Sequence, residues 1–544
     1  MEEPRFWPAF VLIGGASAVV VVLGLAVWGA WRAGLVPAVR NALAAVCLLG
    51  AAGAVGVIVW AAGLPDYCQS GNERLVEEDG QCVGVSDGSH VFDSSISAVS
   101  HKIEQLNDQV VEGGKPYATI ALMIPMTPDE ESEADRAQLL REVQGAYLAQ
   151  YRANVVDKED VPVRLVLANP GRELEHSRRV AGWLAEMARS PKDRLRVVFG
   201  FNLSVRENAD TIGYLTRQQH IPVVGGPITA TDLANDASGR YPGLVKVVPS
   251  NLDQANALRA YLDEDVEKTF LIQDRSGSDL YSRSLLEAFG AVTKGSASVP
   301  EEYDASQVTK NDFALMVGNL CDSQATTVYF AGRPRELTQL VNALGRRGCQ
   351  HRHFRVVTVS GASTIALEPD LDWGALARGK GLTVEYATIT HPDAWAAPEG
   401  PRSPRPPATG GSTDDFAAFT ALLRKNPPSQ IGPTDLSDGR TLTMYDAALT
   451  AITGINKRVA RPGEVPTLSG IEETWRRLRG GNSVKGATGW ICLTNNGTPY
   501  DKAVAIVRLV PSGGDSGGGH LAFQGIAWPT GKPLTAKRCL DTRG

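Results

Sequence analysis

Two long stretches without a charged residue open the chain, and no later stretch resembles them. The first covers residues 7–31 and the second covers residues 42–64. Each is longer than the roughly 20 residues that a helix needs to cross a hydrocarbon core of about 30 Å. The first stretch is also too long for the apolar core of a signal peptide, and no basic segment precedes it. The pattern therefore predicts a transmembrane hairpin of two helices within residues 1–64.

The basic residues beside these stretches predict the orientation of the hairpin. The connector at residues 32–40 contains Arg32 and Arg40 and no acidic residue, whereas two glutamates accompany Arg5 in the N-terminal tail. Because connectors rich in Lys and Arg stay in the cytoplasm, we expect both flanks of the hairpin to lie outside the cell. The sequence thus predicts a two-pass protein of the cell membrane with a large extracellular C-terminal part.

The cysteines fit an oxidising, extracellular compartment. One of the seven, Cys47, lies within the second apolar stretch, which leaves an even number, as disulfide bonding favours. Many pairings are possible, and proximity along the chain suggests three pairs: Cys68–Cys82, Cys321–Cys349 and Cys492–Cys539. The alternative is a zinc site at Cys349, His351 and His353, but their spacing matches no common structural zinc pattern. We therefore expect disulfides and no metal.

After the hairpin, the hydrophobic pattern divides the chain into a short segment and a long α/β region. Residues 65–115 form a juxtamembrane segment with the first cysteine pair, and strand and helix patterns alternate from residue 116 onward. The predicted strands are apolar on both faces: 117–125, 163–168, 195–201, 221–224, 269–272, 327–330 and 354–359. Continuous apolar strands are typical of parallel sheets that helices cover on both faces.

The segments between these strands have the spacing of amphipathic helices. Val180, Trp183, Leu184 and Met187 recur at helical intervals, and a second helix begins at Pro334 and is expected to stop at Gly348. A proline-rich stretch at residues 392–412 is predicted to be a surface excursion, because the alternation resumes after it. The repeated βαβ units and the length of this region predict two doubly wound lobes, with ligand sites at the carboxyl ends of the strands.

Charge and motifs exclude several functions. Lys and Arg number 54 against 60 Asp and Glu, a net charge of −6 without a basic stripe, so nucleic-acid binding has no support. Residues 514–518 read Gly-Asp-Ser-Gly-Gly, as around a serine-protease nucleophile, but they lie in a run of only Gly, Ser and Asp, and no His is followed by Cys. The chain also has no P-loop and no strand-placed dinucleotide motif. We expect no enzyme activity and no cofactor.

Several short segments, taken together and in order, resemble the type I periplasmic binding proteins. The resemblance is to the group that binds leucine, isoleucine, valine and amides, which also includes receptor ligand-binding domains. The segments are Ile124–Thr127, Ile221–Thr231, Val247–Gln254, Gln273–Tyr281, Lys485–Gly489 and Asn495–Gly497. Family membership would imply two α/β lobes joined by three hinge crossings over residues 116–544. It would also imply a discontinuous layout, with lobe one at 116–248 and 382–475 and lobe two at 249–381 and 476–544.

The resemblance also implies where a ligand would bind. In this family a small ligand lies between the lobes, held by hydroxyls, helix N-termini and aromatic rings. The residues that match by position are Thr127, Ser204, Thr229, Thr231, Tyr281, Arg333 and Ser363. Ser204 has an alternative role as a helix N-cap, and Tyr281 as a structural tyrosine. The stretch 360–364 lacks the carboxylate that amino-acid binders use for the ligand's ammonium group, which argues against a standard amino acid.

These implications lead to two functional hypotheses. The first is a membrane-anchored solute-binding protein that passes an amino-acid-like or amide-like ligand to an ABC permease. The second is an extracellular sensor in which lobe closure acts on a membrane signalling partner. A connector of nine residues offers no signalling domain of its own, so the sensor requires a second protein.

Overall fold

The computed structural model of the chain describes most residues after position 73. These are residues 68, 74–129, 132–236, 238–276, 279–396, 409–457, 463–512, 518–535 and 538–539. The predicted membrane helices at 7–31 and 42–64, and most of the Gly-Asp-Ser-Gly-Gly run, lie outside them. Within these ranges no helix is both long enough and apolar enough to span a membrane. Residues 74–544 form one compact unit, whose described residues contain two seven-stranded sheets and one two-stranded sheet.

The first sheet is mostly parallel and carries an antiparallel hairpin at one edge. Its order is β1-β2-β4-β3-β5-β6-β7, and only the β1–β2 and β2–β4 pairs are antiparallel among its described strands. The strands are β1 (Leu75–Glu78), β2 (Gln81–Ser86), β3 (Ala118–Met123), β4 (Val163–Asn169), β5 (Leu195–Gly200), β6 (Val223–Gly225) and β7 (Leu244–Lys246). All six residues of β3 are buried, as the apolar pattern on both faces predicts.

The second sheet has parallel central strands. An antiparallel pair of strands from the C-terminal part of the chain forms one of its edges. Its order is β16-β15-β12-β11-β10-β8-β9, with β15 antiparallel to both of its neighbours. The strands are β8 (Thr269–Asp274), β9 (Glu301–Tyr303), β10 (Thr327–Ala331), β11 (Phe354–Val359), β12 (Leu382–Thr388), β15 (Val504–Pro511) and β16 (Gly519–Ala527). A separate hairpin of β13 (Val484–Gly486) and β14 (Gly489–Ile491) packs on helix α13.

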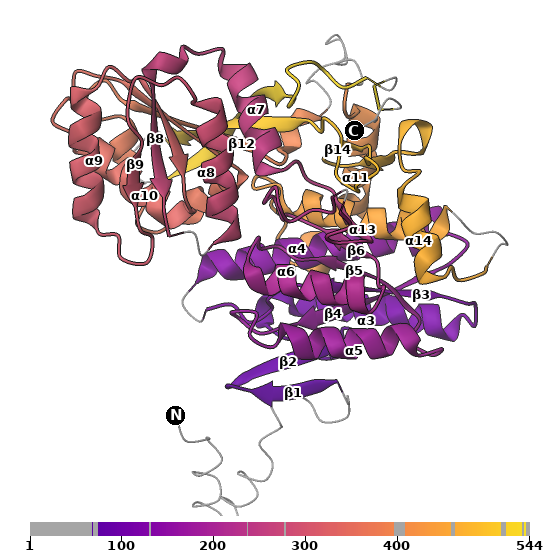
Figure 1. The fold of residues 1–544 in the computed structure, drawn as a ribbon. Helices are drawn as coiled ribbons and strands as arrows, with labels where there is room; N and C mark the ends of the chain where they lie inside the picture. The colour runs from indigo at the N-terminus through magenta and orange to yellow at the C-terminus, as the bar shows by residue number, and fades with distance from the viewer. Residues whose placement is uncertain are drawn as a thin grey trace, which may run out of the picture. The chain divides into compact units, whose positions relative to one another are not determined.

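Helices cover both faces of each sheet, which is why the central strands are apolar throughout. On the first sheet α5 and α6 pack on one face, and α3, α4 and α13 pack on the other. On the second sheet α9 and α10 share one core and α7 and α8 share the other (Figure 1). The bounds are α3 (Ser97–Glu112), α4 (Glu133–Tyr151), α5 (Ser177–Arg189), α6 (Arg206–Gly213), α7 (Asn251–Leu262), α8 (Leu280–Val292), α9 (Lys310–Asp322), α10 (Pro334–Gly345), α11 (Thr413–Lys425), α12 (Pro428–Ile431), α13 (Arg440–Asn456) and α14 (Leu468–Trp475).

The described elements place three crossings between the two lobes, but the lobe boundaries differ from the expected ones. The crossings lie between β7 and α7, between β12 and α11, and between β14 and β15. The expected layout places residues 382–388 in lobe one, whereas β12 pairs with β11 and β15 in the second sheet. The predicted juxtamembrane segment also belongs partly to lobe one, because the β1–β2 hairpin pairs with β4 and α3 packs on that strand.

Two of the predicted disulfide pairs are present among the described residues. Cys321 bonds to Cys349 and Cys492 bonds to Cys539, and Cys68 and Cys82 are also disulfide-bonded cysteines. The first bond takes up the Cys349 thiol that a zinc site would need. Helix α10 begins at Pro334 as predicted, but it ends at Gly345 rather than at Gly348.

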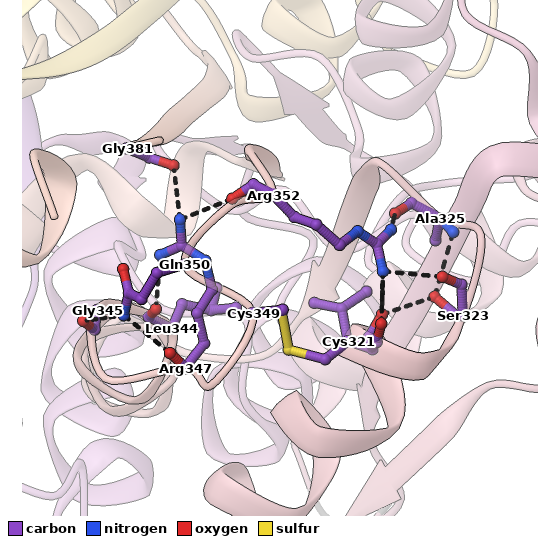
Figure 2. Close-up of a disulfide and its surroundings, with 11 residues drawn as sticks. Cys321, Ser323, Ala325, Leu344, Gly345, Arg347, Cys349, Gln350, Arg352 and Gly381 are labelled. Carbon is purple, nitrogen blue, oxygen red and sulfur yellow. Dashed lines mark hydrogen bonds between the residues drawn. A yellow bond between two sulfur atoms is a disulfide. The ribbon is translucent and has the colours of Figure 1, made fainter. Parts of the chain in front are cut away.

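The buried Arg347 and the half-buried Arg352 reinforce the Cys321–Cys349 bond (Figure 2). Arg352 donates to the carbonyl oxygens of Leu320, Cys321 and Ser323 at 2.7–3.1 Å and to that of Ala325 at 2.5 Å, which satisfies the C-terminal end of α9. Carbonyls in the last turn of a helix have no partner within the helix. Arg347 likewise donates to three carbonyls, including that of Gly381 at 3.2 Å. The disulfide and both side chains therefore join the ends of α9 and α10 to the strands that follow.

Candidate functional site

A cavity of about 190 Å³ lies where the carboxyl ends of both sheets face each other. Lobe one lines it with Gln138, Asn202, Leu203, Ser204, Pro227, Thr229, Asp438, Gly439, Arg440 and Thr443. Lobe two lines it with Tyr281, Arg333, Pro334, Ser360, Gly361, Ser363, Thr364, Thr388 and Ile389. Most of these residues follow β5, β6, β10, β11 or β12. Because parallel strands all end at one edge of their sheet, the loops after them converge there.

Five of the seven predicted ligand residues line this cavity, namely Ser204, Thr229, Tyr281, Arg333 and Ser363. Ser204 is not a helix N-cap, since α6 is preceded by Val205. The Ser204 hydroxyl instead accepts a hydrogen bond from the Ala230 N–H at 3.1 Å. This bond ties the loop after β5 to the loop after β6, so two ligand-loop candidates hold each other in place. Contact with a ligand stays a prediction for all five.

The other two predicted residues make structural contacts away from the cavity lining. The Thr127 hydroxyl accepts from the Asn169 side-chain N–H at 2.9 Å, at the end of β4. Thr231 bonds to Ser284 of lobe two twice: the Thr231 N–H donates to the Ser284 hydroxyl at 2.8 Å, and the two hydroxyls are 3.1 Å apart. Thr231 therefore joins the two lobes to each other. Neither contact was evident from the sequence, because both depend on long-range packing.

Tyr281 is a buried part of the cavity wall and not a half-exposed surface ring. Its side chain is 3% exposed, and its hydroxyl accepts from the Gly361 N–H at 3.0 Å. A Cβ atom on Gly361 would lie 2.1 Å from that hydroxyl, which explains the need for glycine there. Burial raises the pKa of the Tyr281 hydroxyl above its ordinary value, so the hydroxyl stays protonated and can donate a hydrogen bond into the cavity.

The guanidinium of Arg333 is already occupied by a carboxylate. Its Nε and Nη2 atoms donate to the two Asp279 oxygens at 2.8 and 2.6 Å, and its plane lies over the Tyr281 ring at 4.6 Å from the ring centre. Asp279 also accepts from the N–H groups of Tyr281 and Ser282 as the N-cap of α8. The arrangement positions the start of α8 against the cavity and leaves Arg333 with few donors for an anion.

A buried polar network beneath the lobe-one wall was missed by sequence reasoning. Glu142 on α4 is 1% exposed and accepts from the Asn202 side-chain N–H at 2.7 Å and from Arg440 Nη1 at 2.8 Å. Asp438 accepts from Arg141 Nη1 at 2.6 Å. Burial raises the pKa of Glu142, and the Arg440 guanidinium opposes that rise. The sequence carried no clear signal for this network, because polar and apolar residues alternate irregularly along α4.

The lobes also contact each other directly beside the cavity. The Tyr281 N–H of lobe two donates to the Ser204 carbonyl of lobe one at 3.1 Å. Arg283 on α8 forms an ion pair with Asp232 of lobe one at 2.7 Å. Together with the Thr231–Ser284 bonds, these contacts hold the loops after β5 and β6 against the first turn of α8.

Comparisons with known proteins show which solved structures share this fold. No protein-family model matches the chain, and a search of curated proteins finds no match. Among solved structures, the leucine-binding protein LivK of Thermotoga maritima MSB8 is 14% identical, with 76% of this chain and 99% of that chain covered and a TM-score of 0.51. A solute-binding protein of an ABC transporter from R. palustris, in complex with 4-hydroxybenzoate, is 13% identical, with coverage of 75% and 96% and a TM-score of 0.52.

A third structure agrees with these two. The ABC transporter substrate-binding protein of Desulfitobacterium hafniense in complex with Leu is 15% identical, with coverage of 75% and 99% and a TM-score of 0.50. The chains of all three binding proteins are covered almost completely. The two parallel-centred sheets, the three crossings and these similarities lead to one conclusion: the chain has the α/β fold of the type I periplasmic binding proteins.

Proposed function

We propose that the chain is a membrane-anchored extracellular solute-binding protein that captures a small polar ligand between its lobes. In this role it is not an enzyme, and it acts as the substrate-binding component of an ABC-type importer. The observation that carries the proposal is the cavity at the carboxyl ends of both sheets. Its lining combines hydroxyls, amides and guanidinium groups from two lobes, and the Arg283–Asp232 ion pair joins the two lobes at α8. Such a site holds a ligand by hydrogen bonds while excluding water.

The similar structures support the choice of ligand class only in outline. Those of Thermotoga maritima and Desulfitobacterium hafniense are named for leucine, and that of R. palustris for 4-hydroxybenzoate. The shared feature of these ligands is a carboxylate on a small organic molecule. The anchoring part of the proposal depends on the apolar stretches at 7–31 and 42–64, which are long enough to cross a bilayer.

A ligand screen on the full-length chain in detergent tests the proposal. Unfolding is followed by tryptophan fluorescence against amino acids, primary amides, aromatic and hydroxy acids, nucleosides and sugars. A ligand at 100 times its Kd should stabilise the folded state by about 2.7 kcal/mol. Ser363→Tyr, which would fill the cavity from lobe two, should abolish the shift. Ser306→Tyr is the matched control, because Ser306 is exposed on lobe two outside the cavity lining. Absence of any shift with folded protein would refute ligand capture.

One observation favours a sensor as the second candidate. The β1–β2 hairpin, which directly follows the N-terminal region, is built into the sheet of lobe one. Any anchor before it would therefore hold lobe one, and closure would move lobe two relative to the membrane. A sensor predicts ligand-dependent cross-linking of lobe two to a neighbouring membrane protein that is not a permease. An importer instead predicts that uptake of the ligand is lost when the protein is deleted.

A further inference from the structure

We propose that Arg440 selects the ligand, and that the ligand is a small organic anion whose anionic group binds this guanidinium beside the side-chain oxygen of Asn202. The inference rests on the proposed function and names the ligand class of the same cavity. It assigns the selecting role to a residue that the sequence pattern did not single out. It also places that role in lobe one and not on Arg333 of lobe two.

The position of Arg440 presents it to the cavity. The residue starts α13 directly after Gly439, whose φ of 73° is in the left-handed region that favours glycine. The Arg440 N–H donates to the Asp438 carboxylate at 3.0 Å, which fixes the turn. Its side chain is 16% exposed and lines the cavity. The guanidinium is therefore held at one end by the protein and faces the ligand space at the other.

Arg440 gives fewer of its side-chain donors to the protein than Arg333 does. Its Nη1 atom donates to Glu142, and its buried Nε atom lies 3.9 Å from an Asp438 carboxylate oxygen, with no hydrogen bond in the part of the chain that the structure describes. Arg333, by contrast, donates to Asp279 through both Nε and Nη2. A guanidinium carries five N–H groups in a planar fork that matches a carboxylate. The remaining N–H groups of Arg440, on a side chain that is 16% exposed and lines the cavity, are therefore the donors that an anion can bind.

Asn202 adds an acceptor next to the same group. Its side chain is 7% exposed and its N–H₂ group faces the Glu142 carboxylate at 2.7 Å. This contact fixes the orientation of the Asn202 amide, because the flipped amide would place its Oδ1 atom against a Glu142 carboxylate oxygen. The Asn202 Oδ1 atom is then buried without a partner among the described residues. Since Arg440 and Asn202 bind opposite oxygens of one carboxylate, a single small ligand can reach both. The matching ligand has a hydroxyl or N–H group close to its anionic group.

The cavity offers little to a cationic group on the ligand. Asp438 is the carboxylate among the described residues that line it, and one of its oxygens accepts from Arg141 at 2.6 Å while the other accepts from the Arg440 N–H. Asp279 is likewise held by Arg333. An ammonium group would have to compete with these arginines or stay unpaired, and an unpaired buried charge is strongly unfavourable. A hydroxy acid therefore fits better than the corresponding amino acid.

Matched pairs of ligands test the assignment on the full-length chain in detergent. The probes are 2-hydroxyisocaproate and 4-hydroxybenzoate, the primary amide of each, and leucine, with Kd measured by calorimetry. We expect an acid to bind at least tenfold more tightly than its amide, and 2-hydroxyisocaproate more tightly than leucine. Arg440→Gln should remove the preference for the acid, and Arg440→Lys should retain part of it. The matched control is Arg508→Gln, because Arg508 also pairs with a buried glutamate, Glu385, but lies outside the cavity lining.

The outcomes separate this inference from the proposed function. Equal binding of an acid and its amide by the wild-type protein would overturn the role of Arg440, even if Arg440→Gln failed to fold. An acid preference that survives in folded Arg440→Gln would overturn it as well. Binding of a neutral sugar or nucleoside alone would refute the anion but keep ligand capture. No binding by any probe or by the wider screen would refute the proposed function itself.

Discussion

Replacement of Lys246 by methionine should stabilise the protein at neutral pH. Lys246 lies at the end of β7, is 1% exposed, and donates through Nζ to the Ala230 carbonyl at 2.9 Å. Burial lowers the pKa of its ammonium from 10.5 to about 8. That difference corresponds to about 3 kcal/mol of cost for the charged form. Methionine removes the charge but leaves the Ala230 carbonyl without its donor, a loss of about 1–2 kcal/mol. We expect a net gain of about 1–2 kcal/mol in the free energy of unfolding at pH 7.

The pH dependence gives this prediction a second test. Below pH 8 both the folded and the unfolded wild-type chain carry the proton, so the cost of burying the charge is present in full. Between about pH 8 and 10.5 the unfolded state alone retains the proton, and wild-type stability rises with pH relative to Lys246→Met. Urea unfolding at pH 7 and pH 10 measures both values, with Lys294→Met as the exposed control. A variant that is less stable at pH 7, or a difference that does not shrink by pH 10, would refute the reasoning.

Three further substitutions test the packing around the cleft and the disulfide. Arg352→Met should lower the free energy of unfolding by about 2–4 kcal/mol, because it leaves the carbonyls at the end of α9 without a donor, and denaturant titration should show this with the disulfide intact. Gly361→Ala should weaken ligand binding and lower the melting temperature, since its Cβ would meet the Tyr281 hydroxyl at 2.1 Å. Asp232→Asn should speed ligand release in stopped-flow fluorescence with little loss of stability, because the Arg283–Asp232 pair joins the lobes and is partly exposed. An unchanged free energy of unfolding in Arg352→Met, an unchanged melting temperature and affinity in Gly361→Ala, or an unchanged release rate in Asp232→Asn would contradict the contact concerned.

The core of the fold could be predicted from the sequence because burial on both faces leaves a direct pattern. Strand β3 is apolar at all but one position and is wholly buried, and α10 carries its apolar residues at helical spacing from Pro334 onward. The edge strands were not predictable in the same way. The six residues of β2, Gln81–Ser86, contain a cysteine, a glycine and polar residues. Their pairing with β4 depends on an antiparallel neighbour distant in sequence.

The residues of the candidate site also differ in whether they could be predicted from a local pattern or depend on long-range packing. The loops after buried parallel strands could be located from the sequence, so Ser204, Thr229 and Ser363 were found. Glu142 and Arg440 could not, since they are separated by 298 positions and meet only because α4 packs closely on α13. That packing depends on small side chains whose role is invisible in the sequence alone. A Cβ atom on Gly145 would lie 2.4 Å from the carbonyl oxygen of Thr441.

The location of the buried charges makes the two lobes unequal partners in ligand capture. Glu142 and Arg440 sit on α4 and α13 of lobe one, where removal of either partner leaves the other charge buried and uncompensated. Such a network tolerates little displacement, so the lobe-one wall has to be formed before a ligand arrives. The lobe-two wall instead contacts lobe one through hydroxyl bonds and the partly exposed Arg283–Asp232 pair, which can break at small cost. On the proposed function, the ligand therefore meets a rigid selecting surface first, and closure of lobe two through its weaker contacts follows.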